Sequence, residues 1–242
     1  MKDMKTYKFQ RVDSTNTVAK QLAREGADEG TLVIADSQEA GRGRLGRNFF
    51  SPDGGLYMSL LLRPTFSAAD ARLITTAAAV AVCRVLERKK GERFSIKWVN
   101  DIYKDGRKVC GILTESAPSP DGKLEWAVLG IGINLFSTCP VPSELEHILG
   151  FALDSQDDVD KTALAEEIRD EFFLLYPTLC ERKFADEYRK RMFLTGKRVS
   201  VIREEKEIPA LVKGTDDDLR LLVEYDDGTQ ETLGAGEVSI RL

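Results

Sequence analysis

The order of apolar and polar positions along the first part of the chain predicts alternating strands and helices. Three segments rich in apolar residues are typical of buried strands: 31–38, 55–64 and 124–136. A short strand is also expected near 7–10. Helical periodicity with helix start and stop signals marks four segments: 14–26, 67–91, 161–183 and 184–192. Gly26 and Gly91 are expected to end the first two helices.

Residues 94–116 predict a β-hairpin, because the Asp-Gly pair at 105–106 is a two-residue turn signal between β-type runs. With that turn, Asp101 is expected opposite Cys110, and Tyr103 opposite Lys108. These side chains would share one sheet face, with Asp101 and Lys108 close enough to touch one ligand. An exposed ion pair is the alternative, but the neighbouring KWVND residues favour the ligand interpretation.

The pattern changes after Gly196, where only short strand patterns follow. This predicts a separate small β-barrel of about 50 residues, near the lower size limit for independent folding. We therefore divide the chain into a first domain at 1–193 and a C-terminal barrel at 194–242. An acidic linker is expected at 154–160, before the last helices of the first domain.

Composition narrows the class of protein. With 242 residues, 42% hydrophobic and 31% charged, the chain is an ordinary globular sequence of one or two domains. Its formal net charge of −5 and pI near 5.2 argue against a broad nucleic-acid-binding surface. The N-terminus lacks the apolar core of a signal peptide, and no apolar run reaches the roughly 18 residues of a membrane span.

Cysteine usage indicates a reducing compartment. Cys83, Cys110, Cys139 and Cys180 include no CxxC pair, and His147 is the one histidine, so a zinc site is not expected. We interpret the cysteines as reduced and mostly buried thiols, which is typical of a cytoplasmic protein.

A short basic segment contrasts with this acidic chain: residues 41–47, GRGRLGR, hold three arginines, three glycines and no acid. Glycine lets backbone N–H groups approach a ligand closely, and arginine supplies permanent charge suited to phosphate and carboxylate. The segment therefore predicts an anion-binding loop. It lacks the Walker pattern, and no helix follows it as a dinucleotide site requires. A solvated turn or an RNA-contacting tract is the alternative.

Two further segments carry bare or small polar positions. Gly130, Gly132 and Asn134 would face one side of a strand while the alternating apolar residues face the core. A strip without side chains suits a flat ligand or a crossing segment, and close packing of a helix is the alternative. The DSTN stretch at 13–16 begins a helix, where short polar side chains usually serve as plain caps.

Taken together, DSTN, GRGRLGR, KWVNDIY, GRKVCGIL, GIGINL and the terminal GEVSIRL resemble the biotin protein ligase family. The ordered series covers nearly the whole chain and is far more specific than any single member. The resemblance implies an α/β catalytic domain of the class II aminoacyl-tRNA synthetase type, with a mixed sheet and flanking helices, followed by an SH3-like β-barrel. Because the catalytic pattern begins within the first dozen residues, we expect no DNA-binding repressor module of the kind some relatives carry.

The resemblance also implies roles for individual residues. Biotin would be bound by Ser14, Thr15, Asn16, Gln38, Gly41, Arg42, Gly43, Arg44, Lys108, Gly111 and Gly130. The nucleotide would be bound by Arg44, Arg47, Phe49, Asn100, Asp101, Lys108 and Asn134. Arg44, Lys108 and Asp101 would be catalytic, with Asp101 helping the acceptor lysine to lose a proton. The family often has Trp in place of Phe49 and Pro in place of Val99, so we expect weaker nucleotide contact.

The implied reaction is ATP-dependent attachment of biotin to one lysine of a biotin carboxyl carrier protein, through biotinyl-5′-AMP. ATP and Mg²⁺ would be the cofactors and biotin the substrate, with the metal ligands unidentified. The partner would be a carrier protein or carrier domain of a biotin-dependent carboxylase. No nucleic acid or membrane is expected, and a homodimer is allowed. A lipoate ligase, a sensor of biotin or nucleotide without turnover, and a nucleic-acid-binding protein are the rival interpretations.

Overall fold

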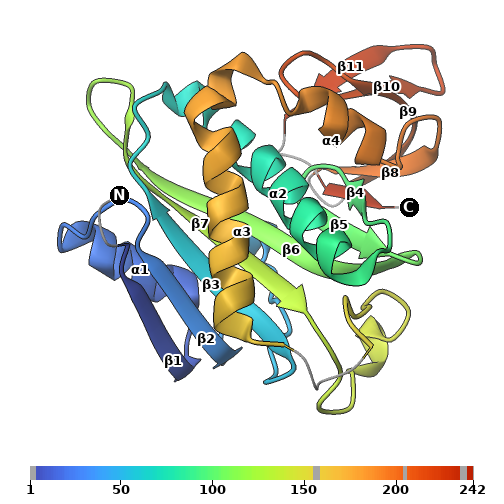
Figure 1. The fold of residues 1–242 in the computed structure, drawn as a ribbon. Helices are drawn as coiled ribbons and strands as arrows, with labels where there is room; N and C mark the ends of the chain where they lie inside the picture. Colours follow the sequence, from blue (N-terminus) through green and yellow to red (C-terminus); the bar gives the residue numbers. More distant parts are fainter. Residues whose placement is uncertain (1–3, 155–158, 204–205, 235–238, 242) are drawn as a thin grey trace.

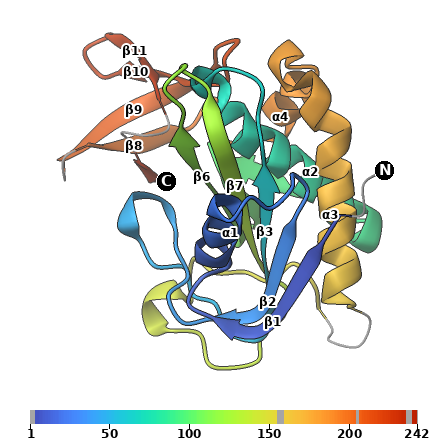
Figure 2. The same ribbon diagram turned by 90° about the vertical axis from the view of Figure 1, so that its left-hand side faces the viewer.

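The computed structural model describes residues 4–154, 159–203, 206–234 and 239–241. They form a seven-stranded mixed sheet and a smaller five-stranded antiparallel sheet. In Figure 1, α2 (Arg72–Lys90) and α3 (Lys161–Leu175) cross one face of the large sheet. Figure 2 shows α1 (Thr15–Arg24) on the opposite face. The expected α/β class, with a mixed sheet and flanking helices, is confirmed.

The large sheet has the strand order β1-β2-β3-β7-β6-β5-β4. Its strands are β1 (Thr6–Val12), β2 (Leu32–Gln38), β3 (Gly55–Leu62), β4 (Ser95–Lys97), β5 (Asp101–Lys104), β6 (Arg107–Pro118) and β7 (Leu124–Asn134). The first two pair in parallel, and the other neighbours pair antiparallel. Helices cover both faces at β3, which explains its continuous apolar run, since every one of its residues is buried.

The first two helices begin and end where the local signals predict. Gly26, just after α1, has a left-handed φ of 86°. Ser67 caps a short 3₁₀ turn (Ala68–Asp70) that leads into α2, and Gly91 ends that helix with a φ of 69°. Glycine adopts such φ values without the steric cost that a side chain adds.

The third helix is shorter than expected. It was predicted over 161–183, but α3 stops at Leu175, because Pro177 has no N–H to continue the helical hydrogen bonds. A 3₁₀ turn (Tyr176–Glu181) and α4 (Ala185–Arg191) follow. None of the helices in the described ranges is both long and apolar enough to cross a membrane.

The hairpin is present, but its register differs from the expected one. Both residues of the turn at 105–106 have positive φ, as a two-residue hairpin turn requires. A β-bulge then shifts the pairing, so Asp101 lies opposite Gly111 rather than Cys110. Cys110 is part of the buried apolar core, and the expectation that it shares the polar face with Lys108 is wrong.

The main apolar core lies between the large sheet and the α2 and α3 helices. The apolar side of 129–135 packs into it, as the alternating pattern predicts. Cys83 and Cys110 are buried there, whereas Cys139 and Cys180 are exposed. The expectation of mostly buried thiols therefore holds for two of the four cysteines.

The C-terminal residues form a strand-only unit with the order β11-β10-β9-β8-β12, which fits the expected SH3-like barrel. Its strands are β8 (Arg198–Arg203), β9 (Lys206–Thr215), β10 (Leu221–Tyr225), β11 (Gln230–Leu233) and β12 (Ser239–Arg241). The boundary at 193/194 stays a prediction, because the main core contains residues from both sides of it. Residues 155–158 of the expected acidic linker lie outside the described residues.

The C-terminal unit packs directly on the large one. The Trp98 indole nitrogen donates to the Leu219 carbonyl oxygen at 2.9 Å. The Asp218 carboxylate lies 3.2 Å from an Arg72 guanidinium nitrogen and accepts from Arg182 at 2.7 Å. These contacts connect the C-terminal unit to the loop before β5 and to the start of α2.

Candidate functional site

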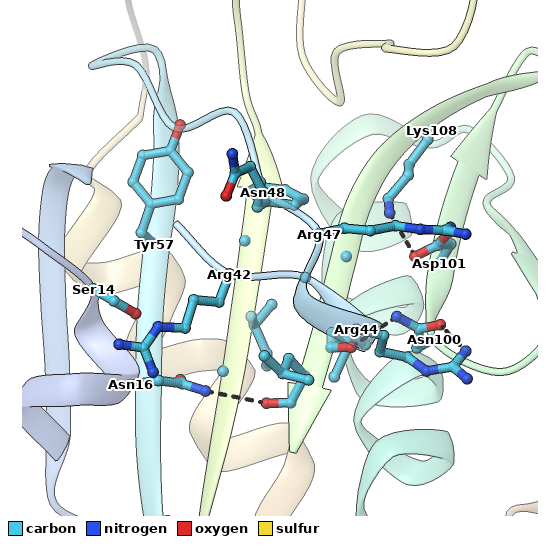
Figure 3. A pocket seen from close by; sticks show the side chains of 18 of the residues that line it. Ser14, Asn16, Arg42, Arg44, Arg47, Asn48, Tyr57, Asn100, Asp101 and Lys108 are labelled. Carbon is cyan, nitrogen blue, oxygen red and sulfur yellow. Dashed lines mark hydrogen bonds and ion pairs between the residues drawn. The ribbon is translucent and has the colours of Figure 1, made fainter. Parts of the chain in front are cut away.

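A cavity of about 160 Å³ opens on the side of the large sheet that carries α1 (Figure 3). Its lining comes from the start of α1, the end of β2, the loop at 41–50, the β4–β5 turn, and strands β6 and β7. We call residues 41–50 the arginine loop. All residues that the sequence nominated for the site line this cavity, except Gly41 and Asn134.

Those two residues lie behind the cavity wall. Gly41 is buried at the base of the arginine loop, where an added Cβ would come within 2.4 Å of the Phe49 carbonyl oxygen. Asn134 is buried at the end of β7, and its side-chain nitrogen donates to the Lys108 carbonyl oxygen at 3.4 Å. They support the loop base and the hairpin rather than face the cavity.

The arginine loop crosses the cavity and sends its side chains to opposite ends (Figure 3). Arg42 points toward α1, where its guanidinium donates to the Thr17 hydroxyl at 3.0 Å. Arg44 points toward the β4–β5 turn. The positive charge of the loop is therefore spread along the cavity instead of being concentrated at one point.

Arg44 rests on a fixed partner. Its guanidinium donates to the Asn100 side-chain oxygen at 3.2 Å. Asn100 is itself held by Ile112, since its Nδ2 donates to the Ile112 carbonyl at 2.9 Å and its carbonyl accepts from the Ile112 N–H at 3.0 Å. Burial lowers the pKa of Arg44, and the nearby Asp101 carboxylate offsets part of that effect. Because the guanidinium group is strongly basic, Arg44 stays charged at neutral pH.

Lys108 and Asp101 meet on the cavity side of the hairpin (Figure 3). The Lys108 Nζ lies 2.7 Å from the Asp101 Oδ1, and both side chains are less than a third exposed. The contact is the one that the hairpin pattern predicts, although the bulge changes the register behind it. An ion pair that lines a cavity beside Arg44 differs from the solvated surface pair of the alternative interpretation.

Protein atoms cover the bare glycine strip. An added Cβ at Gly132 or Gly111 would come within 2.6 or 2.9 Å of the Phe49 ring. At Gly130 the Asn16 side chain takes the same position, 2.2 Å from such a Cβ. A crossing segment therefore covers one end of the strip and helix packing covers the other. The Phe49 ring lies on the part of the glycine strip where a flat ligand could lie.

The start of α1 is bonded into the sheet and is not a plain cap. Within the described part of the chain, the Ser14 side chain makes no capping hydrogen bond. The Thr15 N–H donates to the Gln38 side-chain oxygen at 2.9 Å, and the Ser59 hydroxyl lies 2.6 Å from the Asn16 Oδ1. This end of the cavity thus carries a network of neutral polar groups, with the Arg42 guanidinium beside it.

Sequence reasoning assigned no role to several lining residues: Leu45, Asn48, Tyr57, Lys97, Trp98, Ile112, Leu113 and Ile131. Leu45 and Asn48 belong to the arginine loop, and Lys97 and Trp98 belong to the KWVND series, so proximity to the motifs could have found them. Tyr57 had no such signal, because it reaches the site through its pairing with Gly132 across β3 and β7.

The described residues contain no group of three or more His, Cys, Asp or Glu side chains arranged to hold a metal ion.

Family models match both parts of the chain. The model of the Biotin/lipoate A/B protein ligase family matches residues 8–134, and that of the Biotin protein ligase C terminal domain matches residues 194–241.

Curated relatives match over part of their length. A Bacillus spizizenii protein described as bifunctional ligase/repressor BirA is 39% identical over 160 residues, which cover 65% of this chain and 49% of that protein. The chain therefore spans about half the length of this relative. A biotin–[acetyl-CoA-carboxylase] ligase from Paracoccus denitrificans is 36% identical over 166 residues, which cover 64% of this chain and 68% of that one.

Solved structures match nearly the whole chain. A biotin protein ligase from Aquifex aeolicus, in complex with biotin and ATP, aligns with a TM-score of 0.80 and 26% identity over 98% of both chains. A mutant of that protein in complex with biotin aligns with a TM-score of 0.81 and 26% identity over the same share.

Proposed function

The chain belongs to the biotin/lipoate A/B protein ligase family, and we propose that it is a biotin–protein ligase. It would join biotin and ATP as biotinyl-5′-AMP, releasing pyrophosphate. It would then transfer the biotinyl group to one lysine of a biotin carboxyl carrier protein or domain, releasing AMP. Relatives with the ligase name and a solved relative bound to biotin and ATP support this proposal. The observation that carries it is that Arg42, Arg44 and Lys108 all line one cavity.

The first step needs cationic groups, because a carboxylate must approach the α-phosphate of ATP. Two unit charges about 4 Å apart repel by roughly 4 kcal/mol at an effective dielectric constant near 20. Arg44 and Lys108 lie on the lining at the end of the cavity that holds the β4–β5 turn. There they would offset the repulsion and stabilise the extra negative charge of the pentavalent phosphorus. No covalent enzyme nucleophile is required, since positioning and charge suffice.

The two ends of the cavity suit the two parts of the intermediate. We assign the ring system of biotin to the neutral polar end, near Thr15 and Gln38. The carboxyl group then points along the arginine loop toward Arg44 and Lys108. The nucleotide would lie beyond it, near Asn100 and Asp101, with Mg²⁺ carried on its phosphates. In this arrangement the Phe49 ring either shifts to admit adenine or stacks on it.

The second step brings an acceptor lysine to the mixed anhydride. The lysine must lose a proton before its nitrogen attacks the carboxyl carbon. Asp101 lines the same part of the cavity as Lys108 and is our candidate to receive that proton. The amide bond forms as the bond between the carboxyl carbon and the AMP oxygen breaks.

Several wider assignments belong to the same proposal. The partner is a carrier domain of a biotin-dependent carboxylase, and the compartment is the cytoplasm. The domain division at 193/194, the absence of nucleic acid from the function and a homodimer are also parts of this proposal. None of them is needed for the adenylation chemistry.

Acid-dependent exchange of labelled pyrophosphate into ATP tests the adenylation directly. Exchange supported by biotin and not by lipoate is the expected result. Exchange that requires lipoate would indicate the rival ligase, and binding of biotin or ATP without exchange would indicate a sensor.

A further inference from the structure

A buried chain of hydrogen bonds runs from β6 to the neutral end of the cavity. It connects Glu115, Asn16, Ser59, Thr15 and Gln38 in that order. Thr15 and Gln38 line the cavity, whereas Glu115 lies outside its lining. We propose that Glu115 is a positioning residue that orients the Asn16 amide and, through it, the Ser59 and Thr15 hydroxyls, so that the cavity floor accepts N–H groups. The inference rests on the proposed function and concerns how the site selects biotin.

Glu115 can only accept hydrogen bonds. Its Oε1 lies 2.7 Å from the Lys20 Nζ, and its Oε2 accepts from the Asn16 Nδ2 at 2.8 Å. Burial alone would raise the pKa of Glu115, but hydrogen bonds from Lys20 and Asn16 and the charges of Lys20 and Arg42 lower it. The group is therefore ionised at neutral pH. An ionised carboxylate has no proton to donate.

This fixes the Asn16 amide. Its nitrogen faces Glu115, so its oxygen faces Ser59, at 2.6 Å from the Ser59 hydroxyl oxygen. The Leu113 carbonyl, 3.5 Å from the Asn16 nitrogen, favours the same orientation more weakly. Since an amide oxygen only accepts, the single proton of the Ser59 hydroxyl goes to Asn16.

The direction then passes to Thr15. Its hydroxyl oxygen lies 2.8 Å from the Ser59 hydroxyl oxygen and 3.2 Å from the Gln38 Oε1. With the Ser59 proton already used, the Thr15 proton is directed at one of these two oxygens, both on the protein side. Ser59 is fully buried, so no water substitutes in the chain at that point. The Thr15 hydroxyl is thus left with lone pairs for a ligand.

Gln38 completes the floor. Its side-chain oxygen accepts from the Thr15 N–H at 2.9 Å, and its side-chain nitrogen donates to the Ser51 hydroxyl at 3.0 Å. The floor therefore offers oxygen lone pairs at Thr15, and one more at Gln38 when the Thr15 proton is directed at Ser59. The ureido ring of biotin carries two N–H donors, whereas the dithiolane ring of lipoate carries none. Acceptors on the cavity floor stabilise the ureido ring of biotin. With lipoate bound, the same acceptors would stay without hydrogen-bond donors.

Glu115→Gln keeps the shape of the side chain but reverses the direction. Because Lys20 only donates, it holds the amide oxygen of the new glutamine, and the amide nitrogen then faces Asn16. Asn16 must turn its oxygen toward that nitrogen, so it donates to Ser59. The Ser59 proton passes to Thr15 and takes one of the lone pairs that the ligand would use.

The test compares biotin with its two mono-N-methyl ureido analogues by titration calorimetry without ATP. The wild type should prefer biotin over the analogue whose blocked nitrogen faces the floor. In Glu115→Gln, affinity for biotin should fall about 10-fold and affinity for that analogue less than about 2-fold, so the preference narrows. A merely structural role would weaken both ligands equally and leave the preference unchanged, which would overturn the inference.

Two further variants sharpen the test. Lys20→Met is measured at alkaline pH, where the carboxylate at 115 stays ionised without its lysine partner. The preference should then stay within about 2-fold of the wild type. In the double variant Asn16→Asp with Glu115→Gln, the new carboxylate at 16 only accepts, and the new amide at 115 donates to it. Ser59 then donates to residue 16 as in the wild type, so the preference for biotin should return. If the preference stays narrow in the double variant, the relay is wrong. If the wild type binds biotin and the methylated analogue equally well, the role of Glu115 is contradicted but the proposed function is not. If the wild type binds no biotin, the proposed function is contradicted as well.

Discussion

Two adjacent residues, Asn100 and Asp101, hold the two cationic groups at one end of the cavity. Asn100 accepts from Arg44, and Asp101 contacts Lys108 at 2.7 Å. Both belong to the junction of the β4–β5 turn and β5, and Asn100 is tied to the Ile112 backbone on both sides. The spacing of the two charges is therefore set by the backbone of one turn rather than by flexible side chains.

Arg44→Ala should loosen the hold on the adenylate. The variant removes a charge-assisted hydrogen-bond donor, worth about 1.5–3 kcal/mol, so release of biotinyl-AMP should accelerate about 10- to 100-fold. Chromatography of free adenylate after rapid filtration measures this release. Arg11→Ala is a matched control, because the Arg11 side chain is 67% exposed and its ion pair with Glu39 is long at 4.0 Å. Equal release from Arg44→Ala and the wild type would refute the role.

Gly132→Ala should weaken nucleotide binding. The added methyl would come within 2.6 Å of the Phe49 ring and push it off the strip. Overpacking of this kind costs about 1–3 kcal/mol, so affinity for ATP should fall roughly 10-fold. Gly234→Ala is the control, since an added Cβ there meets open space. Titration with ATP in the presence of biotin measures the affinity of both variants. Equal affinity of Gly132→Ala and Gly234→Ala for ATP would contradict the placement of adenine beside Phe49.

Among the elements, α4 is short and depends on its contacts. A helix of seven residues is not stable alone. The Tyr188 hydroxyl donates to the Val99 carbonyl at 3.2 Å, just before the turn that carries Asn100. Glu187 pairs with Arg191 within α4 and with Arg84 of α2, and the second pair joins the two helices. The α4 helix therefore holds the β4–β5 turn through Tyr188.

Glu187→Gln should destabilise the protein in a pH-dependent way. Burial alone would raise the pKa of Glu187, but hydrogen bonds from Arg84 and Arg191 lower it. Because the folded-state pKa is lowered, the stabilisation is present above the ordinary carboxyl value of about 4.3 and is lost as the pH falls below it. Urea unfolding should show a loss of about 1–3 kcal/mol at pH 7 that shrinks on acidification.

The control for this prediction is Glu181→Gln. Glu181 pairs with Lys183, and both side chains are more than half exposed, so its removal should change stability by less than about 1 kcal/mol. A pH-independent difference between Glu187→Gln and the wild type would show that the ion pairs are not its cause.

The arginine loop should be protected by its ligands. We expect the loop to be loose in the free protein and to fold over the intermediate, which keeps water from the anhydride. Its tip residue Leu45 is 57% exposed. Trypsin should cleave within 41–50 much more slowly when biotin and Mg-ATP are present. Equal cleavage with and without them would contradict the closure.

Local chemistry explains which elements could be predicted from the sequence. The turn at 105–106 and the helix ends at Gly26 and Gly91 need positive backbone φ values, which the residue types at these positions predict. The bulge beside Asp101 depends instead on packing of Cys110 into the core, which no local pattern reveals. For the same reason the motifs contain most of the lining residues, but they do not reveal that Phe49 and Asn16 cover the glycine strip.

At the scale of the whole molecule, the site depends on contacts between distant parts of the chain. The start of α1 and the arginine loop come from one half of the large sheet, the hairpin comes from the other half, and β7 lies between them. Trp98 lines the cavity and also donates to Leu219 in the C-terminal unit. The smaller sheet therefore supports one wall of the site, and a continuous apolar core joins the two units.

The two units should unfold together. Scanning calorimetry is expected to give one transition, because the apolar core crosses the predicted boundary. Trp98→Phe leaves the Leu219 carbonyl without its donor, which should cost about 1–3 kcal/mol and lower the temperature of that single transition. Two separate transitions, with the substitution moving one of them alone, would contradict this coupling.

The central claim is that one cavity, lined by Arg42 at one end and by Arg44 and Lys108 at the other, joins two anions and passes the product to a lysine. The most direct measurement is the intact mass of a biotin carrier domain after incubation with this protein, biotin and Mg-ATP. The account predicts the gain of one biotinyl group, and no gain when either biotin or ATP is omitted. A carrier whose mass stays the same with all components present would contradict it.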